Sequence, residues 1–159
     1  MKNQIYLYFG NKTDKISFKN LDRRDKRRVK KSPNLIKNPS FLSSRWLKFK
    51  LKKRDIFISH KSKFSVIGIS KKKIGIDMEE LKSRNFNSIV EFCFTQEEKN
   101  FFYDCDDKIL TFYKIFTTKE AILKYKNLNF SDFKKVSYFD NDIYKFHIKK
   151  FNFLITVVF

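Results

Sequence analysis

The stretch Phe116-Thr117-Thr118-Lys119-Glu120-Ala121-Ile122-Leu123-Lys124 lies in a run, residues 107–126, whose apolar residues recur at helical spacing. At about 100° per residue, one helical stripe holds Ile109, Phe112, Tyr113, Phe116 and Leu123. Glu120 falls within that stripe, and Lys124 lies one turn further along its edge. A carboxylate on a buried face costs roughly several kcal/mol unless a cation or hydrogen bonds compensate it. Glu120 therefore needs a partner, which could be a metal ion or Lys124.

A second acidic pattern precedes this helix, in Ile74-Gly75-Ile76-Asp77-Met78-Glu79. A strand has a period of two, so Gly75, Asp77 and Glu79 share one face. Two carboxylates on one face repel each other unless something positive lies between them, and Mg²⁺ prefers such hard oxygen ligands. We expect Gly75 to leave room for a ligand near the backbone. The alternatives are a solvated strand end here and an ordinary surface pair of Glu120 with Lys124, worth about 0.3–0.5 kcal/mol.

The composition is that of a folded chain with a strongly basic balance. Hydrophobic residues make up 42% of the 159 residues and aromatic residues 18%, which is enough for a packed core. The 36 Lys and Arg against 17 Asp and Glu give a net charge of +19, which favours nucleic acid, a phosphorylated ligand, an anionic membrane or an acidic protein as partner. Lys, Phe, Ile and Asn are all used heavily, so a coding bias can explain part of the lysine content.

Targeting and redox signals are absent from the sequence. No stretch approaches the ~18 apolar residues of a membrane span, and the N-terminus lacks the architecture of a signal peptide. Cys93 and Cys105 form no CxxC pair and have no His nearby, so we expect two reduced thiols. These features predict a soluble cytoplasmic protein that does not associate with membranes.

The order of elements predicts an α+β fold of two similar halves, residues 1–76 and 77–159. Each half would hold a helix followed by three antiparallel strands, and the halves would form one compact pseudo-dimer with a ligand cleft between them. Ser40 is expected to cap the first-half helix, the basic segment 22–28 to form a helix or loop, and Lys71–Lys73 to turn a hairpin. The expected strands are 5–9, 55–59, 64–70 and 74–79, followed in the second half by 136–139, 143–149 and 153–159.

Two motifs carry a family resemblance. Gly75-Ile76-Asp77-Met78-Glu79 and Phe116–Lys124 resemble the two signature motifs of the 4′-phosphopantetheinyl transferase superfamily, and Ile58-Ser59-His60 and the chain order are also similar to that family. The resemblance extends from about Arg23 onward and is strongest over residues 58–126. Because the Gly-x-Asp motif follows a complete first half, the chain resembles the surfactin-synthetase-activating type, in which one chain forms the pseudo-dimer with its active site between the halves.

The resemblance implies a reaction and a set of catalytic residues. The 4′-phosphopantetheine group of coenzyme A would pass to a serine of an apo acyl or peptidyl carrier protein, the holo-acyl-carrier-protein synthase activity of fatty acid biosynthesis and related pathways. Asp77, Glu79 and Glu120 would hold Mg²⁺. Glu120 or a metal-ordered water would accept the serine proton, while Lys124 and the metal would neutralise charge on the phosphoryl oxygens.

Other positions are implied to bind coenzyme A. His60 and Lys124 would contact its phosphates, Lys119 would add a second cation, and Arg23 with Lys26 would hold the 3′-phosphate. The stretch 40–59 is shorter than in the surfactin type and lacks its Gly-Lys-Pro contact, so we expect Lys52, Lys53 or Arg54 to replace that contact. Glu98 matches an acidic family position near the site, and a helix-surface glutamate is the alternative.

Two other functions fit parts of the sequence. A basic, aromatic-rich chain could be a nucleic-acid-binding module without enzymatic activity, although it carries no RRM, KH or zinc signature. A relative that keeps the fold but has lost the activity is less consistent with intact Asp77, Glu79, Glu120 and Lys124. We therefore expect a monomeric enzyme whose partners are coenzyme A and an acidic carrier protein steered by charge, with no nucleic acid.

Overall fold

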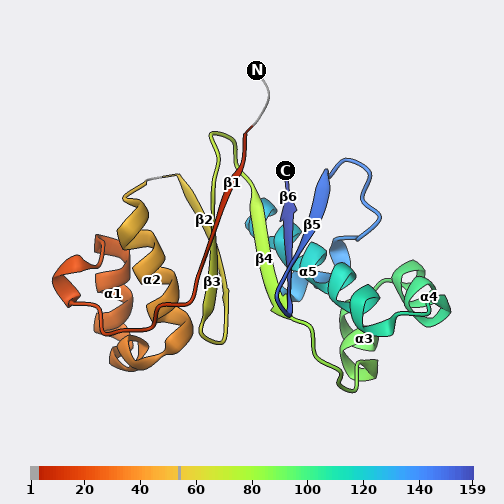
Figure 1. Cartoon of the computed structure of the whole chain (residues 1–159). Coiled ribbons are helices and arrows are strands. Elements are labelled where there is room, and N and C mark those ends of the chain that lie inside the picture. The colour runs from red at the N-terminus through yellow and green to blue at the C-terminus, as the bar shows by residue number, and fades with distance from the viewer. Residues whose placement is uncertain (1–3, 54) are drawn as a thin grey trace. The chain divides into compact units, whose positions relative to one another are not determined.

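The computed structural model describes residues 4–53 and 55–159 and divides into two units, Met1–Lys71 and Lys72–Phe159 (Figure 1). Arg54, one candidate for the missing coenzyme contact, lies outside the described residues. The expected boundary between residues 76 and 77 falls inside strand β4, Gly75–Glu80, which belongs entirely to the second unit. In the part of the chain that the structure describes, no helix is both long and apolar enough to cross a membrane.

The first unit is a three-stranded antiparallel sheet with helices on one face (Figure 1). The strand order is β1-β3-β2, and α2 packs against all three strands. Gly10 lies on the helical face, since a Cβ at this position would be 3.4 Å from the Leu47 side chain of α2. The elements are β1 Tyr6–Gly10, α1 Arg23–Lys31, α2 Pro39–Leu51, β2 Ile56–Lys61 and β3 Phe64–Ile69, with short 3-10 turns at Phe18–Asn20 and Pro33–Lys37.

Side-chain caps begin both helices of the first unit. The Asp22 carboxylate accepts from the Asp25 backbone N–H at 2.8 Å, so the basic segment forms a helix. Asn38 caps α2 by accepting from the Phe41 N–H, and Pro39 takes the first helical position, where no donor is needed. The expected cap at Ser40 is therefore wrong, and the Ser40 hydroxyl donates to the Ser62 carbonyl across the unit.

A buried ion pair joins α1 to α2. Asp25 is 1% exposed and accepts from Arg45 at 2.7 Å and from Lys48 at 2.8 Å. Burial alone would raise the pKa of Asp25, but hydrogen bonds and attraction from Arg45 and Lys48 outweigh burial, and its pKa is lowered. The carboxylate therefore stays ionised and holds the two helices together.

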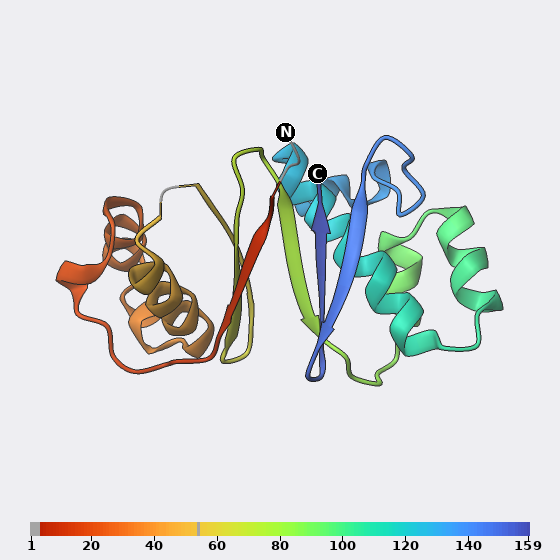
Figure 2. The same ribbon diagram turned by 45° about the horizontal axis from the view of Figure 1, so that its top comes forward.

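The second unit repeats the architecture of the first. Its sheet order is β4-β6-β5, and α5 runs along one face of the sheet (Figure 2). In both units one strand comes first, the helices follow, and a hairpin closes the unit with its last strand in the middle of the sheet. This confirms the predicted α+β fold of two similar halves. The elements are β4 Gly75–Glu80, α3 Asn87–Cys93, α4 Gln96–Asp104, α5 Lys108–Lys126, a 3-10 turn Phe130–Lys135, β5 Lys145–Lys150 and β6 Phe153–Val158.

Two strand predictions were wrong. The strand after Lys71–Lys73 is not the return strand of a hairpin with 64–70, because β4 pairs with β6 in the register Asp77↔Thr156. The segment 136–139 forms bends and turns, and the backbone N–H of Tyr138 donates to a Glu98 carboxylate oxygen at 2.6 Å. The Glu98 side chain thus accepts the hydrogen bond that the Tyr138 N–H would have donated to a neighbouring strand.

A chain of hydrogen bonds crosses the interior of the second unit. Thr156 of β6 lies opposite Asp77 on one side and His147 of β5 on the other. The Thr117 hydroxyl donates to the Tyr113 carbonyl at 2.7 Å, so Thr156 must donate to Thr117 across their 2.6 Å contact. His147 Nδ1, at 2.8 Å, must then donate to Thr156, which selects the Nδ1–H tautomer. Burial, with Lys114 and Lys145 nearby, lowers the pKa of His147 to about 4.

We predict that His147 makes the second unit sensitive to acid. The unfolded chain takes up a proton near pH 6.5, while the folded His147 resists protonation until about pH 4, so its contribution to stability is complete above about pH 6.5 and is lost as pH falls toward 4. Urea unfolding of wild type should therefore lose more free energy between pH 7 and pH 4.5 than unfolding of His147→Gln, which can still donate to Thr156. Parallel curves for wild type and His147→Gln would contradict the prediction.

Candidate functional site

Two carboxylates converge on one lysine in the second unit. Asp77 lies in the middle of β4 and is 3% exposed, and Lys124 Nζ of α5 donates to its Oδ1 at 2.6 Å. A carboxylate oxygen of Glu120, one turn earlier on α5, lies 4.0 Å from the same Nζ. The structure therefore brings together Asp77, Glu120 and Lys124, and the closer partner of Lys124 is Asp77.

The charge of Lys124 is secured by its surroundings. Burial lowers the pKa of Lys124, but attraction to Asp77, followed by Glu120 and Glu79, outweighs burial and raises the pKa overall. Glu79, two residues after Asp77 on β4, therefore acts on the same ammonium group. All three expected metal ligands thus lie within the electrostatic reach of one cation.

The close approach of β4 and α5 depends on Gly75. A Cβ at this position would lie 2.0 Å from the carbonyl oxygen of Ala121 and 2.9 Å from the Tyr125 Cβ. Backbone atoms cannot yield this much space, so only glycine fits. The expectation that Gly75 makes room for a ligand is wrong, because the room is taken by α5. The glycine of the first motif and the alanine of the second are in contact, and this contact puts Asp77 within reach of Lys124.

Glu98 is buried at the start of α4 and binds three donors. Its Oε2 accepts from the Thr95 backbone N–H at 2.7 Å and from Lys119 Nζ at 2.5 Å, and its Oε1 accepts from the Tyr138 backbone N–H at 2.6 Å. The Thr95 hydroxyl oxygen accepts from the Glu98 backbone N–H, which completes a capping box. Glu98 is 0% exposed, so a surface glutamate is excluded. The Thr95-x-x-Glu98 spacing is typical of a capping box and could have predicted this role of Glu98 from the sequence.

Lys119 points into the core of the second unit. It is 0% exposed, and its Nζ lies 5.9 Å from the Phe94 ring and 5.6 Å from the Phe133 ring in addition to its bond with Glu98. Burial lowers the pKa of Lys119, and Glu98 offsets only part of this effect. We therefore correct the expected coenzyme contact of Lys119 to a structural role. The buried pair with Glu98 also fixes the rotation of α5, which leaves Glu120 and Lys124 on the side that meets β4.

The other expected coenzyme ligands belong to the first unit. His60 is exposed on β2, Arg23 is exposed at the first turn of α1, and Lys26 is half-buried on the same helix. Lys52 and Lys53 are exposed where α2 ends. All five side chains keep enough exposure to meet a ligand, and their roles stay predictions.

The donor set around Lys124 suits a hard divalent cation. No group of three His, Cys, Asp or Glu side chains in residues 4–53 and 55–159 is arranged to hold a metal ion by itself. Mg²⁺, however, usually takes one or two carboxylates and completes its shell with waters and substrate phosphates. Asp77 and Glu120 supply two carboxylates that already share one positive charge, so the residues present fit this ion.

Comparisons with known proteins match the part of the chain that holds this site. A sequence model of the 4′-phosphopantetheinyl transferase superfamily matches residues 73–155, which contain both motifs. A Haemophilus influenzae protein named "Putative 4′-phosphopantetheinyl transferase" is 32% identical over 69 residues. The matched segment is 43% of this chain and 29% of that relative.

We predict that the second unit depends on the Glu98–Lys119 pair. Glu98→Ala leaves a buried ammonium and two backbone donors without their acceptor and should cost about 3–5 kcal/mol in the free energy of unfolding. Glu98→Gln with Lys119→Met removes both charges and should cost clearly less than Glu98→Ala. Urea unfolding followed by circular dichroism measures these values, with Glu97→Ala, on the exposed side of α4, as a control within about 0.5 kcal/mol of wild type. A Glu98→Ala variant as stable as that control would contradict the prediction.

Proposed function

Because the chain belongs to the 4′-phosphopantetheinyl transferase superfamily, we propose that it transfers the 4′-phosphopantetheine group of coenzyme A to a serine of an apo acyl or peptidyl carrier protein. The single observation that supports this most directly is the convergence of Asp77 and Glu120 on Lys124, at 2.6 and 4.0 Å from its Nζ. Each of these residues lies in one of the two motifs, and the site combines acidic ligands, a proton acceptor and a cation, which phosphoryl transfer requires.

The reaction is a displacement at the β-phosphorus of coenzyme A. The serine oxygen forms the new bond to phosphorus, the bond to adenosine 3′,5′-bisphosphate breaks, and the leaving group carries away the electron pair. Glu120, whose side chain is 26% exposed, is placed to accept the serine proton. Lys124 keeps 40% of its side chain exposed on a flexible stem, so its ammonium group can turn toward the phosphoryl oxygens and neutralise their charge.

Asp77, Glu79 and Glu120 are the residues that would hold Mg²⁺. When bound, the ion would supply charge neutralisation at the diphosphate. Asp77 is the best-positioned of the three, since it is buried in the middle of β4 and cannot rotate away from the site. Glu120 would then serve as both ligand and proton acceptor, or as one of them.

The remaining roles follow from the family resemblance. His60 would contact the coenzyme phosphates, and Arg23 with Lys26 would hold the 3′-phosphate, with Lys52 or Lys53 on the adenine side. The carrier protein is expected to be acidic and steered by the basic surface, so its transfer rate should fall with ionic strength. We propose a monomeric enzyme with holo-acyl-carrier-protein synthase activity.

We predict Mg²⁺-dependent transfer that requires Glu120. Incubation with coenzyme A, Mg²⁺ and an apo carrier protein should add one phosphopantetheine to the carrier, as seen by intact-protein mass spectrometry. Glu120→Gln should fold normally and lose at least about a hundredfold in rate, since general-base catalysis alone contributes about 10²–10⁴. Glu97→Gln, a matched change on the exposed side of α4, should transfer at the wild-type rate. No modification of any apo carrier by wild-type protein would overturn the proposed function.

We further predict that Lys124 and a divalent cation compete for Asp77. Without coenzyme A, Lys124→Met should bind Mn²⁺, a spectroscopic substitute for Mg²⁺, about tenfold more tightly than wild type, or ~1.4 kcal/mol. Titration monitored by electron paramagnetic resonance of free Mn²⁺ measures this directly and does not depend on activity. Lys126→Met removes an exposed lysine that pairs with Asp140 and should leave Mn²⁺ affinity unchanged. Equal affinity of Lys124→Met and wild type would show that Lys124 and the metal do not share Asp77.

A further inference from the structure

The positive charge of the chain is concentrated in one unit. Residues 1–71 carry 21 Lys and Arg against 4 Asp and Glu, a net charge of +17, whereas residues 72–159 carry 15 against 13, a net charge of +2. A coding bias toward lysine acts on the whole chain and does not explain why acidic residues are scarce in one unit only. The imbalance therefore points to a partner of the first unit.

Arginine is concentrated more sharply still, on helix α1. The chain has 29 Lys and only 7 Arg, and 4 of the 7 Arg fall within residues 23–28. Arginine presents a planar fork of donors that matches the two oxygens of a phosphate or carboxylate, whereas lysine is a point charge. Lysine is the usual cation of this chain, but α1 carries arginines, which can pair with two oxygens of one phosphate or carboxylate.

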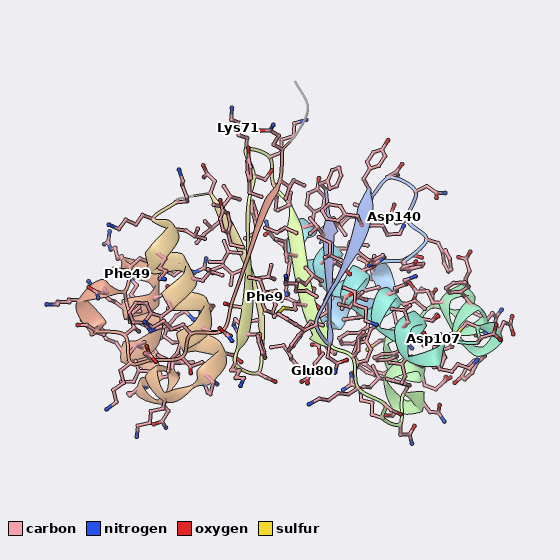
Figure 3. All side chains as sticks on the ribbon, viewed as in Figure 1. Phe9, Phe49, Lys71, Glu80, Asp107 and Asp140 are labelled. Carbon is pink, nitrogen blue, oxygen red and sulfur yellow. The ribbon has the colours of Figure 1, made fainter. Side chains whose placement is uncertain are left out.

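Most of the cations of α1 face solvent and form no ion pair with the residues that the structure describes. The two acids at the start of α1 are paired with helix α2: Asp25 is buried and bound to Arg45 and Lys48, and Asp22, which is 45% exposed, is bound to Lys48. Figure 3 shows nitrogen-tipped side chains projecting outward from the part of the unit that holds α1 and α2. Within the described residues, five exposed cations of this helix form no ion pair: Arg23, Arg24, Arg27, Lys30 and Lys31.

The charge density of α1 matches that of a nucleic acid. Nine residues span about 13 Å at 1.5 Å per residue, and seven of them are Lys or Arg, which gives one cation per about 2 Å. One strand of a nucleic-acid helix carries one negative charge per about 3.4 Å, so α1 has enough cations to meet every phosphate of a single strand that runs along it. One phosphate monoester of a coenzyme is satisfied by one or two cations, so most of the charge on α1 is left for another ligand.

The surface of α1 lacks the apolar groups with which membranes and protein partners are usually held. A helix that lies on a membrane buries an apolar face in the lipid, but the only apolar residue of α1 is Val29, which is 7% exposed. Protein interfaces centre on buried apolar or aromatic anchors, and the outer face of α1 offers none. Close to the helix, Phe18 is 42% exposed and has Lys26 Nζ 6.0 Å from its ring, an arrangement suited to stacking with an unpaired base.

We propose that α1 binds single-stranded nucleic acid, with Arg24, Arg27, Lys30 and Lys31 on the phosphates and Phe18 stacked on a base. This activity goes beyond the proposed phosphopantetheinyl transfer and does not depend on it. It also differs from the expectation that nucleic acid is not a partner, because the net positive charge is concentrated in the first unit and, within that unit, on α1.

Fluorescence anisotropy with labelled oligouridine and oligothymidine tests this proposal. The variant Arg24→Gln/Arg27→Gln/Lys31→Gln should bind at least tenfold more weakly than wild type at about 0.1 M salt, and the slope of log K against log salt should flatten by about 2, or ~0.7 per lost phosphate contact. Lys71→Gln/Lys72→Gln/Lys73→Gln removes the same charge outside α1 and should weaken binding much less. Phe18→Ala should lower affinity for single strands and leave duplex binding unchanged.

Three results would overturn the proposal. Equal weakening in the two triple variants would show diffuse attraction without a site on α1. Binding of wild type to vesicles rich in phosphatidylserine, with no binding to either oligonucleotide, would assign α1 to membranes. Slower carrier modification by the α1 variant, with oligonucleotide binding unchanged, would make α1 the carrier-docking surface. The carrier-modification assay runs without nucleic acid, so failure of the proposed enzyme activity is recorded separately.

Discussion

The buried pair of Glu98 and Lys119 is the interaction on which the second unit depends. Burying two charges costs more than their attraction returns unless the remaining lone pairs and protons are also satisfied. Here the Thr95 N–H of the capping box shares Oε2 of Glu98 with Lys119, the Tyr138 N–H binds Oε1, and aromatic rings flank the ammonium group. The pair ties α4, α5 and the segment before β5 to one point, which sets the rotation of α5 about its axis.

A second constraint sets how close α5 lies to the sheet. The contact of Gly75 with the Ala121 carbonyl allows the helix and β4 to approach at backbone distance. Because the rotation of α5 and its distance from β4 are both fixed, Lys124 lies within hydrogen-bond distance of Asp77. The site is therefore a consequence of packing: the two motifs hold the chemically active residues and also the small residues that bring the two elements together.

The sequence predicted the parts of this arrangement that are encoded locally. The helical stripe placed Glu120 among apolar residues, and strand alternation placed Asp77 and Glu79 on one face. Both patterns led us to expect a positive charge beside these carboxylates. The predictions that were wrong concern contacts with residues that are distant in the sequence. Lys119 lies one residue from Glu120, and no local signal separated a lysine that faces Glu98 from one that faces solvent. The Lys71–Lys73 turn was compatible with a hairpin, but the partner of β4 is β6, which lies at the far end of the chain.

The placement of the two basic side chains follows from their chemistry. Lysine occupies the buried position 119 and the partly exposed position 124. At each position a compact charge on a flexible stem reaches one carboxylate, and Lys124 can leave it again. An arginine at 124 would grip Asp77 through two parallel hydrogen bonds and would be harder to displace by a metal ion or to turn toward a phosphate. On α1 the opposite property is useful. A surface that binds successive phosphates is strengthened by the rigid guanidinium groups of arginine, and its side chains do not have to leave a buried carboxylate. Lysine at position 124 therefore suits a charge that moves between partners, whereas the arginines of α1 suit charges that stay on phosphates.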